Sequence, residues 1–438
     1  MSTTVAPLGT SAFPAPAPAP DPVDDGGLKG RALRAGEIYA LQHSGLAAAL
    51  FAVLRRVKPN ATIAETTIVT RLSDVHEVLS RDDAFTVGLY APKMEAIAGT
   101  FILGMEHTPK YEHDASVLRL AVPRSDMPRI GAIVDEIVAE IFAEADAPGS
   151  LEVVGGLTDA VPARLSQRYF GVPGPDERTL IMWGRAIFRE LFFNIRNDPV
   201  ITAPASAASA AMRQWVGGLI AARRDAGPAT YGDDTLGRLL TMSAEPQLGI
   251  DDAWIQTYLI GLLIGMLPLT SKATALAIDA LLDRPGPLAA AQAAARADDD
   301  ELLAAYLSEA MRFSPQAPGQ FRLAARDVTI ASGTRRETTI PAGGRVFAAT
   351  QSAMLDGAAL KRPRQYRTDR PSYDYLHFGY GLHACFGRYI SREVQMPAMF
   401  KALLRRENLH RAPGEAGRLL WRGPFPDRLH VRFAPDGA

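Results

Sequence analysis

Apolar residues recur along most of this chain with the period of an α-helix. In residues 130–143, IGAIVDEIVAEIFA, the apolar positions at i, i+3, i+4 and i+7 fall on one helix face. Stretches rich in glycine and proline, such as 171–177 and 283–287, separate this segment from others with the same pattern. We expect these further helices at residues 157–169, 179–193, 207–224, 251–282, 299–313 and 388–406.

Patterns typical of β-strands are fewer and shorter. Residues 61–72 alternate in part and are rich in Thr and Ile, and residues 325–350 contain two or three short candidate strands joined by turns. Residues 419–433 have the pattern of a hairpin whose turn lies near residues 423–427. The chain shows no internal repeat. The sequence therefore predicts a mainly α-helical protein with a minor β-sheet region.

The most apolar segment, residues 258–269, is expected to be a buried core helix. It is shorter than the about 20 apolar residues that a membrane span needs, and it contains Gly261, Gly265 and Pro268. We therefore expect no membrane anchor. The formal net charge of −1 also argues against nucleic-acid binding and against a polybasic membrane contact. A cytoplasmic, monomeric protein is the expectation.

The N-terminal residues differ in composition from the rest of the chain. Residues 1–27 are rich in Ala and Pro and lack the basic start and unbroken apolar core of a signal peptide. We expect a disordered tail there, followed by one catalytic domain over residues 28–438. The chain has a single cysteine, Cys385, which excludes an intramolecular disulfide and a zinc site built on several thiolates.

Cys385 lies in the segment HFGYGLHACFGRYI, residues 377–390. A thiolate nucleophile needs a base, and His383 is only two residues away, but neighbours at that spacing in an extended turn usually point apart. A single thiolate ligand, by contrast, suits an iron that four porphyrin nitrogens already hold. The commoner role of a lone cysteine is that of a buried, inert residue.

The residues around Cys385 favour the iron ligand. Gly379, Gly381 and Gly387 lack a Cβ, so the backbone can approach a flat macrocycle and adopt positive φ values. Free backbone N–H groups in such a loop can hydrogen-bond the sulfur. Phe378 can shield the sulfur from water, and His383 suits an anionic propionate. Because a helix is expected to follow, its dipole would also favour a thiolate.

These residues resemble a known family. Phe378-Gly379-x-Gly381-x-His383-x-Cys385-x-Gly387 is similar at every defined position to the heme-binding signature of the cytochrome P450 family, and the resemblance covers roughly residues 28–435. It implies the family's helical prism enclosing heme b, with Cys385 as the axial ligand of the iron. It also implies an oxidoreductase that acts on a small to medium hydrophobic substrate.

Four further positions fit the same resemblance. Glu309 and Arg312 lie at i and i+3 in the helix expected at 299–313, and the family uses such a pair, joined by a later arginine, as a buried structural unit. Arg370 fits that later arginine. Arg322 is similar to the arginine that contacts a heme propionate at the start of a strand.

The central helix departs from the family pattern. Its middle usually carries a glycine followed by an acid and a threonine, which deliver protons to dioxygen. If Gly265 is the anchor, Leu267 and Pro268 occupy the acid and alcohol positions, and neither can relay a proton. Pro268 should also kink the helix, because proline inside a helix costs on the order of 3 kcal/mol. Thr270 could take the alcohol role only after a shift of register. We list Gly265, Leu267, Pro268 and Thr270 as the candidate catalytic positions.

The distal residues leave three functions open. The first is monooxygenation, with electrons supplied by a partner such as a ferredoxin and a ferredoxin reductase, because the chain contains no flavin- or ferredoxin-like segment. The alternative is a peroxygenase or a hydroperoxide-rearranging enzyme, which needs no dioxygen activation. The third is a non-catalytic heme sensor or carrier.

A second departure lies in residues 107–122, where the family usually places His or Trp four residues before an arginine. Tyr111 and His113 are candidate contacts of the heme propionates by analogy, although the surface of an amphipathic helix is the more common place for such residues.

Overall fold

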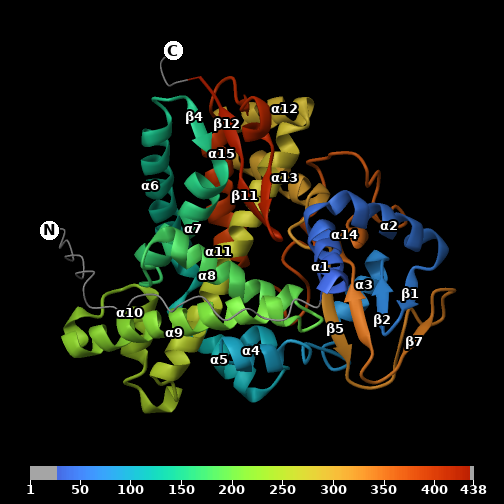
Figure 1. The fold of residues 1–438 in the computed structure, drawn as a ribbon, viewed down its shortest axis with the longest axis horizontal. Helices are drawn as coiled ribbons and strands as arrows, with labels where there is room; N and C mark the ends of the chain where they lie inside the picture. The colour runs from blue at the N-terminus through green and yellow to red at the C-terminus, as the bar shows by residue number, and fades with distance from the viewer. Residues whose placement is uncertain (1–26, 435–438) are drawn as a thin grey trace.

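The computed structural model describes residues 27–434, and Figure 1 shows a mainly helical protein with a sheet-containing region at one side. The predicted fold class is therefore confirmed. The expected N-terminal tail lies outside the described residues, except for Gly27, with which the first helix begins.

Most of the chain between the short strands forms α-helices. Their bounds are α1 (Gly27–Gln42), α2 (Ser44–Val57), α3 (Leu72–Ser80), α4 (Ala91–Ile97), α5 (Pro109–Ala121), α6 (Met127–Ala145), α7 (Ala160–Arg168), α8 (Glu177–Phe188), α9 (Pro199–Ala226), α10 (Thr235–Met242), α11 (Asp252–Leu282), α12 (Pro285–Arg296), α13 (Asp300–Phe313), α14 (Thr350–Ala353) and α15 (Met396–Leu404). Three π-helical segments adjoin them: η4 (Val154–Asp159), η5 (Arg189–Phe193) and η9 (Ile390–Gln395). Short 3₁₀ turns are η2 (Ile102–Gly104), η3 (Arg124–Asp126), η6 (Pro228–Thr230), η7 (Pro246–Leu248), η8 (Ser372–Asp374) and η10 (Gly414–Gly417).

The strands form four small sheets. Their bounds are β1 (Asn60–Ile63), β2 (Thr66–Val69), β3 (Phe85–Thr86), β4 (Ser150–Glu152), β5 (Gln320–Ala324), β6 (Val328–Ile330), β7 (Thr338–Ile340), β8 (Arg345–Ala348), β9 (His410–Arg411), β10 (Leu420–Arg422), β11 (Phe425–Arg428) and β12 (His430–Arg432). The largest sheet has the order β1-β2-β8-β5-β3, in which only β2 and β8 pair in parallel. The others are β6–β7, β10–β11 and β4-β12-β9.

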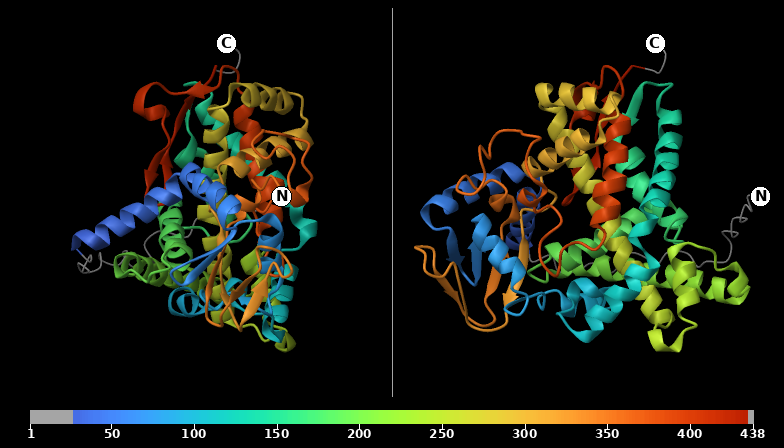
Figure 2. Two further views of the ribbon diagram at one scale, coloured as in Figure 1. Left: turned by 90° about the vertical axis from the view of Figure 1, so that its right-hand side faces the viewer. Right: turned by 180° about the vertical axis from the view of Figure 1, so that it is seen from behind.

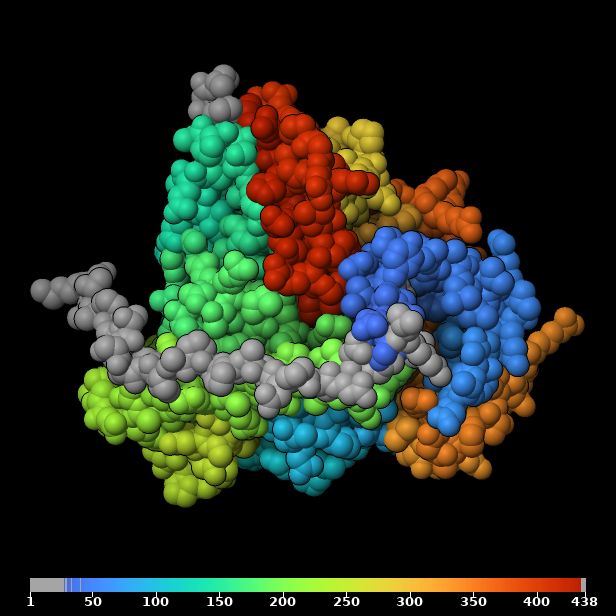
Figure 3. Space-filling model, in the orientation of Figure 1, coloured from blue at the N-terminus to red at the C-terminus, as the bar shows by residue number. Residues whose placement is uncertain are grey.

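The predicted hairpin at residues 419–433 is shorter than expected. Only β10 and β11 form it, with Arg422 opposite Phe425 across the turn. The next strand, β12, pairs instead with β4 and β9. β4 lies far away in the sequence, so no local pattern indicated this sheet. In the space-filling view the C-terminal strands lie at the surface, between the helices and the sheet region (Figure 3).

Helix α11 runs through the middle of the helical part and packs against α8, α9, α13 and α15 (Figures 1 and 2). It is long and apolar enough to span a membrane, but most of its apolar window is buried inside the protein. It is the core helix that the sequence predicted. The kink expected at Pro268 does not end the helix, because α11 continues through this residue. Pro268 is buried near Gly184 of α8, and this packing offsets the backbone hydrogen bond that proline cannot make.

The last helix brings the cysteine segment against the core. The sequence predicted one helix over residues 388–406, and the structure has η9 followed directly by α15. Helix α15 packs against α6, α12 and α13, as the view from behind shows (Figure 2). Its buried Met399, Phe400 and Leu403 anchor the segment that begins at Cys385.

Candidate active site

The loop before Cys385 depends on two glycines with left-handed backbone. Gly379 has φ 74° and Gly381 has φ 72°, which L-residues with a Cβ rarely adopt. A Cβ on Gly381 would in addition clash with the carbonyl oxygen of Leu79. The Cys385 amide donates to the Phe378 carbonyl over 2.8 Å and closes the loop. These contacts fix the position of the thiol.

Gly387 serves a different purpose from these two glycines. A Cβ added there would meet no atom of the protein within 4 Å, so the packing of the described chain does not require glycine. The backbone amides of Gly387 and Arg388 lie near the thiol of Cys385 and favour its charged form. Burial raises the pKa of this thiol, and the two amides, together with the Arg388 guanidinium, act in the opposite direction. Donors aimed at the sulfur favour a thiolate.

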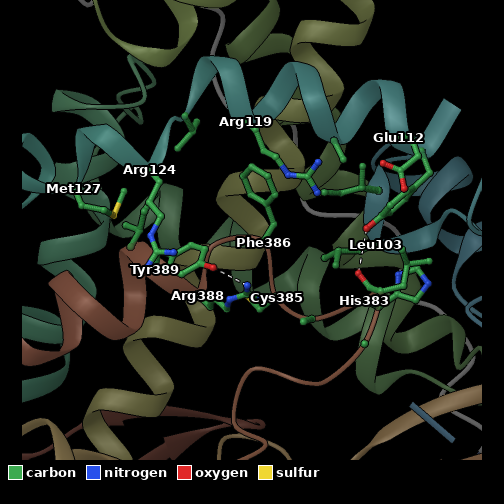
Figure 4. A pocket seen from close by; sticks show the side chains of 18 residues that line it. Leu103, Glu112, Arg119, Arg124, Met127, His383, Cys385, Phe386, Arg388 and Tyr389 are labelled. Atoms are coloured by element: carbon green, nitrogen blue, oxygen red, sulfur yellow. Dashed lines mark hydrogen bonds between the residues drawn. The ribbon is translucent and has the colours of Figure 1, made fainter. Parts of the chain in front are cut away.

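Cys385 lines a cavity of about 550 Å³ between helix α5 and the cysteine loop (Figure 4). Tyr111, Ala115 and Arg119 line it from α5, four residues apart and hence on one helix face. Phe386 and His383 line it from the loop. The sequence analysis did not assign Arg119, although the four-residue spacing from Tyr111 through Ala115 could have indicated it.

Two buried polar groups lack the partners they need. Both ring nitrogens of His383 are buried and accept or donate no hydrogen bond within the described part of the chain. Burial, and next the charge of Arg322, lower the pKa of His383 to about 4. Arg322 is only 3% exposed and donates to the Phe321 carbonyl over 2.8 Å. No carboxylate among residues 27–434 forms an ion pair with it. A buried guanidinium and an unpartnered imidazole together fit an anionic ligand.

The two candidates on α5 differ in position. The Tyr111 hydroxyl donates to the Leu382 carbonyl over 3.1 Å, and its ring lies 6.1 Å from that of His383. His113 does not line the cavity. Its Nδ1 lies 2.9 Å from a carboxylate oxygen of Asp114, and its side chain is 42% exposed. The expectation that His113 contacts the cofactor is therefore corrected, because α5 turns this residue toward the surface.

The middle of α11 presents one partly uncovered stripe, formed by Leu262, Gly265 and Leu269 at i, i+3 and i+7. A Cβ on Gly265 would meet no protein atom within 4 Å. The sequence named Gly265 as a candidate catalytic position, and the segment 262–269 that contains both leucines was expected to line the substrate pocket.

The other three distal candidates lie off this stripe. Leu267 and Pro268 are buried, and both approach Gly184 of α8. Thr270 is also buried, and its Oγ1 lies 3.0 Å from Ser391 Oγ. Thr270 could take the alcohol role only after a shift of register, and its hydroxyl is instead engaged with Ser391.

A buried ion cluster holds the segment before the cysteine loop. Arg312 Nε and Nη2 each donate to a carboxylate oxygen of Glu309 over 2.7 Å, and both side chains are fully buried. Arg370 Nε donates to Glu309 Oε1 over 3.1 Å, and the Tyr375 hydroxyl donates to the same oxygen over 3.0 Å. Arg312 also donates to the Pro363 carbonyl. The structure thus brings Glu309, Arg312 and Arg370 together.

Comparison with known proteins gives a consistent result. The family model described as Cytochrome P450 matches residues 297–419, which include Glu309, Arg370 and Cys385. Cytochrome P450 144 of Mycobacterium tuberculosis is 26% identical, with 78% of each chain covered. Nocardicin C N-oxygenase of Nocardia uniformis is 28% identical, over 77% of this chain and 81% of its own length.

Two other similarities are of a different kind. A bifunctional dioxygenase (DOX)-epoxy alcohol synthase (EAS) of Pyricularia oryzae is 34% identical over 139 residues, which are 32% of this chain. The chain spans only 12% of that fungal protein's length. Among solved structures, CalO2 superposes with a TM-score of 0.76 at 23% identity, covering 89% of this chain and 96% of the other. This last likeness concerns the fold alone.

The fold and the thiol-lined cavity are those of a heme-thiolate protein. The chain belongs to the cytochrome P450 family. It is accordingly a heme-thiolate oxidoreductase with heme b as its cofactor, and the predicted family, cofactor and enzyme class are confirmed. The residues described above fit this group: a thiol with two amides aimed at it, a buried guanidinium without an anion, and an unpartnered histidine.

Proposed function

We propose that this protein oxidises a hydrophobic substrate with a hydroperoxide rather than with dioxygen. The observation that supports this most directly is the stripe on α11, which consists of Leu262, Gly265 and Leu269. None of them can donate or accept a proton. Thr270, the nearest hydroxyl on this helix, is directed to Ser391.

The overall reaction follows from this choice of oxidant. In RH + R′OOH → ROH + R′OH, the O–O bond breaks, one oxygen enters the substrate, and the other leaves as an alcohol with its hydrogen. A rearrangement of ROOH into an isomer needs no second reactant at all. Both reactions begin with oxygen that is already reduced, so neither needs a proton relay to dioxygen. A stripe made of hydrocarbon is sufficient for them.

The protein's own residues hold and shield the reacting groups. Bound heme supplies the iron at which the O–O bond is cleaved. Cys385 is proposed as its axial thiolate, with the Gly387 and Arg388 amides stabilising the negative sulfur. We assign the propionate contacts to Arg322, His383, Tyr111 and Arg119, since they line or face the cavity or lack an anionic partner. Phe378 and Phe386 exclude water from the sulfur side.

Glu309, Arg312 and Arg370 are proposed as a structural unit without contact to substrate. Their ion cluster lies between α13 and the segment around Gln365, whose carbonyl also accepts from Arg312. This segment leads directly into the cysteine loop. The cluster therefore positions Cys385 through the backbone.

The relatives are similar to this chain in ways that support two different oxidants, a hydroperoxide and dioxygen. The similarity to the fungal dioxygenase-epoxy alcohol synthase, over 32% of this chain, supports an oxidative reaction other than standard monooxygenation. Monooxygenation is the second candidate, because nocardicin C N-oxygenase covers far more of the chain. In that case a ferredoxin and a ferredoxin reductase would supply electrons, and Arg388 and Arg392, near Cys385, are candidates for the docking face. For either function we propose a monomeric, cytoplasmic protein, and catalysis rather than heme sensing.

One comparison of oxidants tests the proposal. Purified holoenzyme is supplied with a hydrophobic substrate and either an organic hydroperoxide or a ferredoxin system under air. We expect product with the hydroperoxide, also under nitrogen. Product with the ferredoxin system alone would overturn the peroxide mechanism and establish monooxygenation.

A further inference from the structure

Lys272 is a fully buried lysine in the centre of the protein. It lies on α11 with a relative exposure of 0%, and its Nζ makes no hydrogen bond within residues 27–434. Burial of an ammonium group without a counter-charge is strongly unfavourable. None of the functions proposed above uses this side chain, so its presence needs a separate explanation.

Three aromatic rings surround the amine. Nζ lies 5.3 Å from the ring centre of Phe193, 5.8 Å from that of Trp421 and 5.9 Å from that of Phe425. Rings at this distance attract a cation through their π faces. They cannot neutralise its charge. The rings therefore offset only part of the cost of burying an ammonium group, and no described residue supplies an anion beside it.

The charged groups on the neighbouring elements are engaged elsewhere or are cations themselves. Asp159 of η4 forms a two-bond pair with Arg185, whose guanidinium lies 5.6 Å over the Phe425 ring. Asp427 of β11 pairs with Arg422. Arg189, beside the turn at Gly423, adds a further positive charge. No carboxylate among the described residues forms an ion pair with Lys272.

Lys272 lies on the same side of α11 as Gly265. It follows Gly265 by seven residues, which is 20° short of two full turns and about 10 Å along the helix axis. Helical side chains also lean toward the N-terminus, so the amine is directed back toward Leu269. An extended molecule with one end at Lys272 would therefore run along the stripe past Gly265.

The wall of the Lys272 site is a separate structural unit. Strands β10 and β11, which contribute Trp421 and Phe425, pair only with each other among the described strands. Figure 1 shows β11 alongside α11. At the tip, the Gly423 carbonyl accepts from Gln42 over 2.7 Å. Trp421 and Phe425 of this hairpin therefore form the wall that a ligand of the amine would contact.

We propose that Lys272 binds the carboxylate of an aliphatic substrate, so that this oxidoreductase acts on long-chain carboxylic acids or their hydroperoxides. The inference rests on the proposed function for the reaction and names the substrate class. The rings of Phe193, Trp421 and Phe425 enclose the ion pair, and the hydrocarbon chain of the acid lies along Leu269, Gly265 and Leu262. Carboxylate binding supplies the anion that the buried amine lacks.

The protonation of Lys272 is consistent with this role. Burial lowers the pKa of Lys272 to about 7, so the free protein holds the amine near its point of neutralisation. An incoming carboxylate stabilises the ammonium form and raises that pKa. Binding of an acid should then be accompanied by proton uptake at neutral to mildly alkaline pH.

Calorimetric titration of the holoenzyme with dodecanoic acid and with its methyl ester tests the proposal. We expect the wild type to bind the acid at least about tenfold more tightly than the ester, since a hydrogen bond to a charged group is lost in the ester. Lys272→Met should bind the acid and the ester equally, because only the apolar contacts with the hydrocarbon chain remain. The matched control is Lys58→Met, which changes an exposed lysine far from Lys272 in the sequence. This variant should keep the preference for the acid over the ester.

Folding of the variants is checked by thermal unfolding. Removing an unpaired buried amine should not lower the unfolding temperature. The acid, but not the ester, should raise the unfolding temperature of the wild type and of Lys58→Met. It should not raise the unfolding temperature of Lys272→Met. Equal binding of acid and ester by the wild type, or an unchanged preference in Lys272→Met, would overturn the carboxylate site.

The two proposals fail separately. Lys272-dependent binding of the acid without turnover by any hydroperoxide would refute the proposed oxidant and leave the binding site intact. Hydroperoxide-driven oxidation of a neutral hydrocarbon, with no preference for acids, would refute the carboxylate site and leave the proposed oxidant intact.

Discussion

Thr270 Oγ1 lies 3.0 Å from Ser391 Oγ and so connects the central helix to the segment that follows Cys385. The first hydroxyl after Pro268 therefore faces the helix on the cysteine side. The residue on the partly uncovered stripe at this level is Leu269. The position at which a proton-relaying hydroxyl would act is thus a leucine, and the first prediction concerns it.

Leu269→Thr should increase turnover with dioxygen and a ferredoxin system relative to turnover with a hydroperoxide. The new hydroxyl would stand on the stripe beside Gly265, where it can pass a proton. The ratio of the two rates measures the effect. Thr270→Val is the control: it removes a hydroxyl that bonds Ser391 and should leave the ratio unchanged. An effect of Thr270→Val as large as that of Leu269→Thr would contradict the assignment of the stripe.

Cys385→Ser should abolish the long-wavelength Soret band of the ferrous–CO form, because the alcohol cannot replace a thiolate ligand. Since Cys385 is the only cysteine in the chain, thiol titration gives an independent measurement. One thiol per chain should react in the heme-free protein, and none in the holoenzyme. Retention of the Soret band in the variant would rule out the thiolate.

Substitutions of two glycines near the cysteine should have different consequences. Gly381→Ala should destabilise the protein by at least about 1–2 kcal/mol, because φ is 72° and the Cβ meets Leu79. Gly387→Ala should leave the stability of the heme-free protein unchanged, since nothing lies within 4 Å. It should nevertheless lower heme content. Denaturation of the heme-free forms and the heme-to-protein absorbance ratio check both, and normal heme loading of Gly387→Ala would refute the clearance role.

Glu309→Gln should lower the free energy of unfolding by roughly 3–5 kcal/mol, since it leaves two buried guanidinium groups, of Arg312 and Arg370, without their anion. Urea denaturation measures the loss. The matched control is Asp369→Asn, which breaks an ion pair with Arg367 near the surface and should change stability little. Similar losses in the two variants would show that the buried cluster is not structural.

Stability should depend on pH through Lys272. Its pKa is about 7 in the folded protein against an ordinary value of 10.5. Between these values the unfolded chain binds more protons, so the wild type gains stability as pH rises through this window. Lys272→Met lacks this component, and its advantage over the wild type should shrink from about pH 7 to about pH 9.5. Urea denaturation at both pH values measures it. Parallel behaviour of wild type and variant, with Lys58→Met as reference, would contradict a buried, neutralised amine.

Local patterns were sufficient for much of this protein. The helical period predicted α11 and α13 within one residue and α6 within three, because a buried face requires apolar residues at fixed spacing. The cysteine segment was equally legible from the sequence. Left-handed glycines, a histidine and a single thiol lie within ten residues of one another, so a local pattern is enough to identify the ligand loop.

Contacts between distant segments were beyond such patterns. No local signal joined β4 to β12, and none showed which way the hydroxyl of Thr270 and the side chain of His113 are directed. The direction of a helical side chain depends on the rotation of its helix within the fold. That rotation is decided by packing against several partners at once.

The sequence by itself therefore determined the fold class, the cofactor and the identity of the proximal thiol, because these follow from local spacing. Only the tertiary structure decided which face of α11 lies uncovered and that Lys272 has no anion beside it. Both the exposure of a helix face and the lack of a counter-charge depend on the segments that pack around a residue. The same lysine would be an ordinary surface charge if rings from η5 and β11, far away in the sequence, did not enclose it.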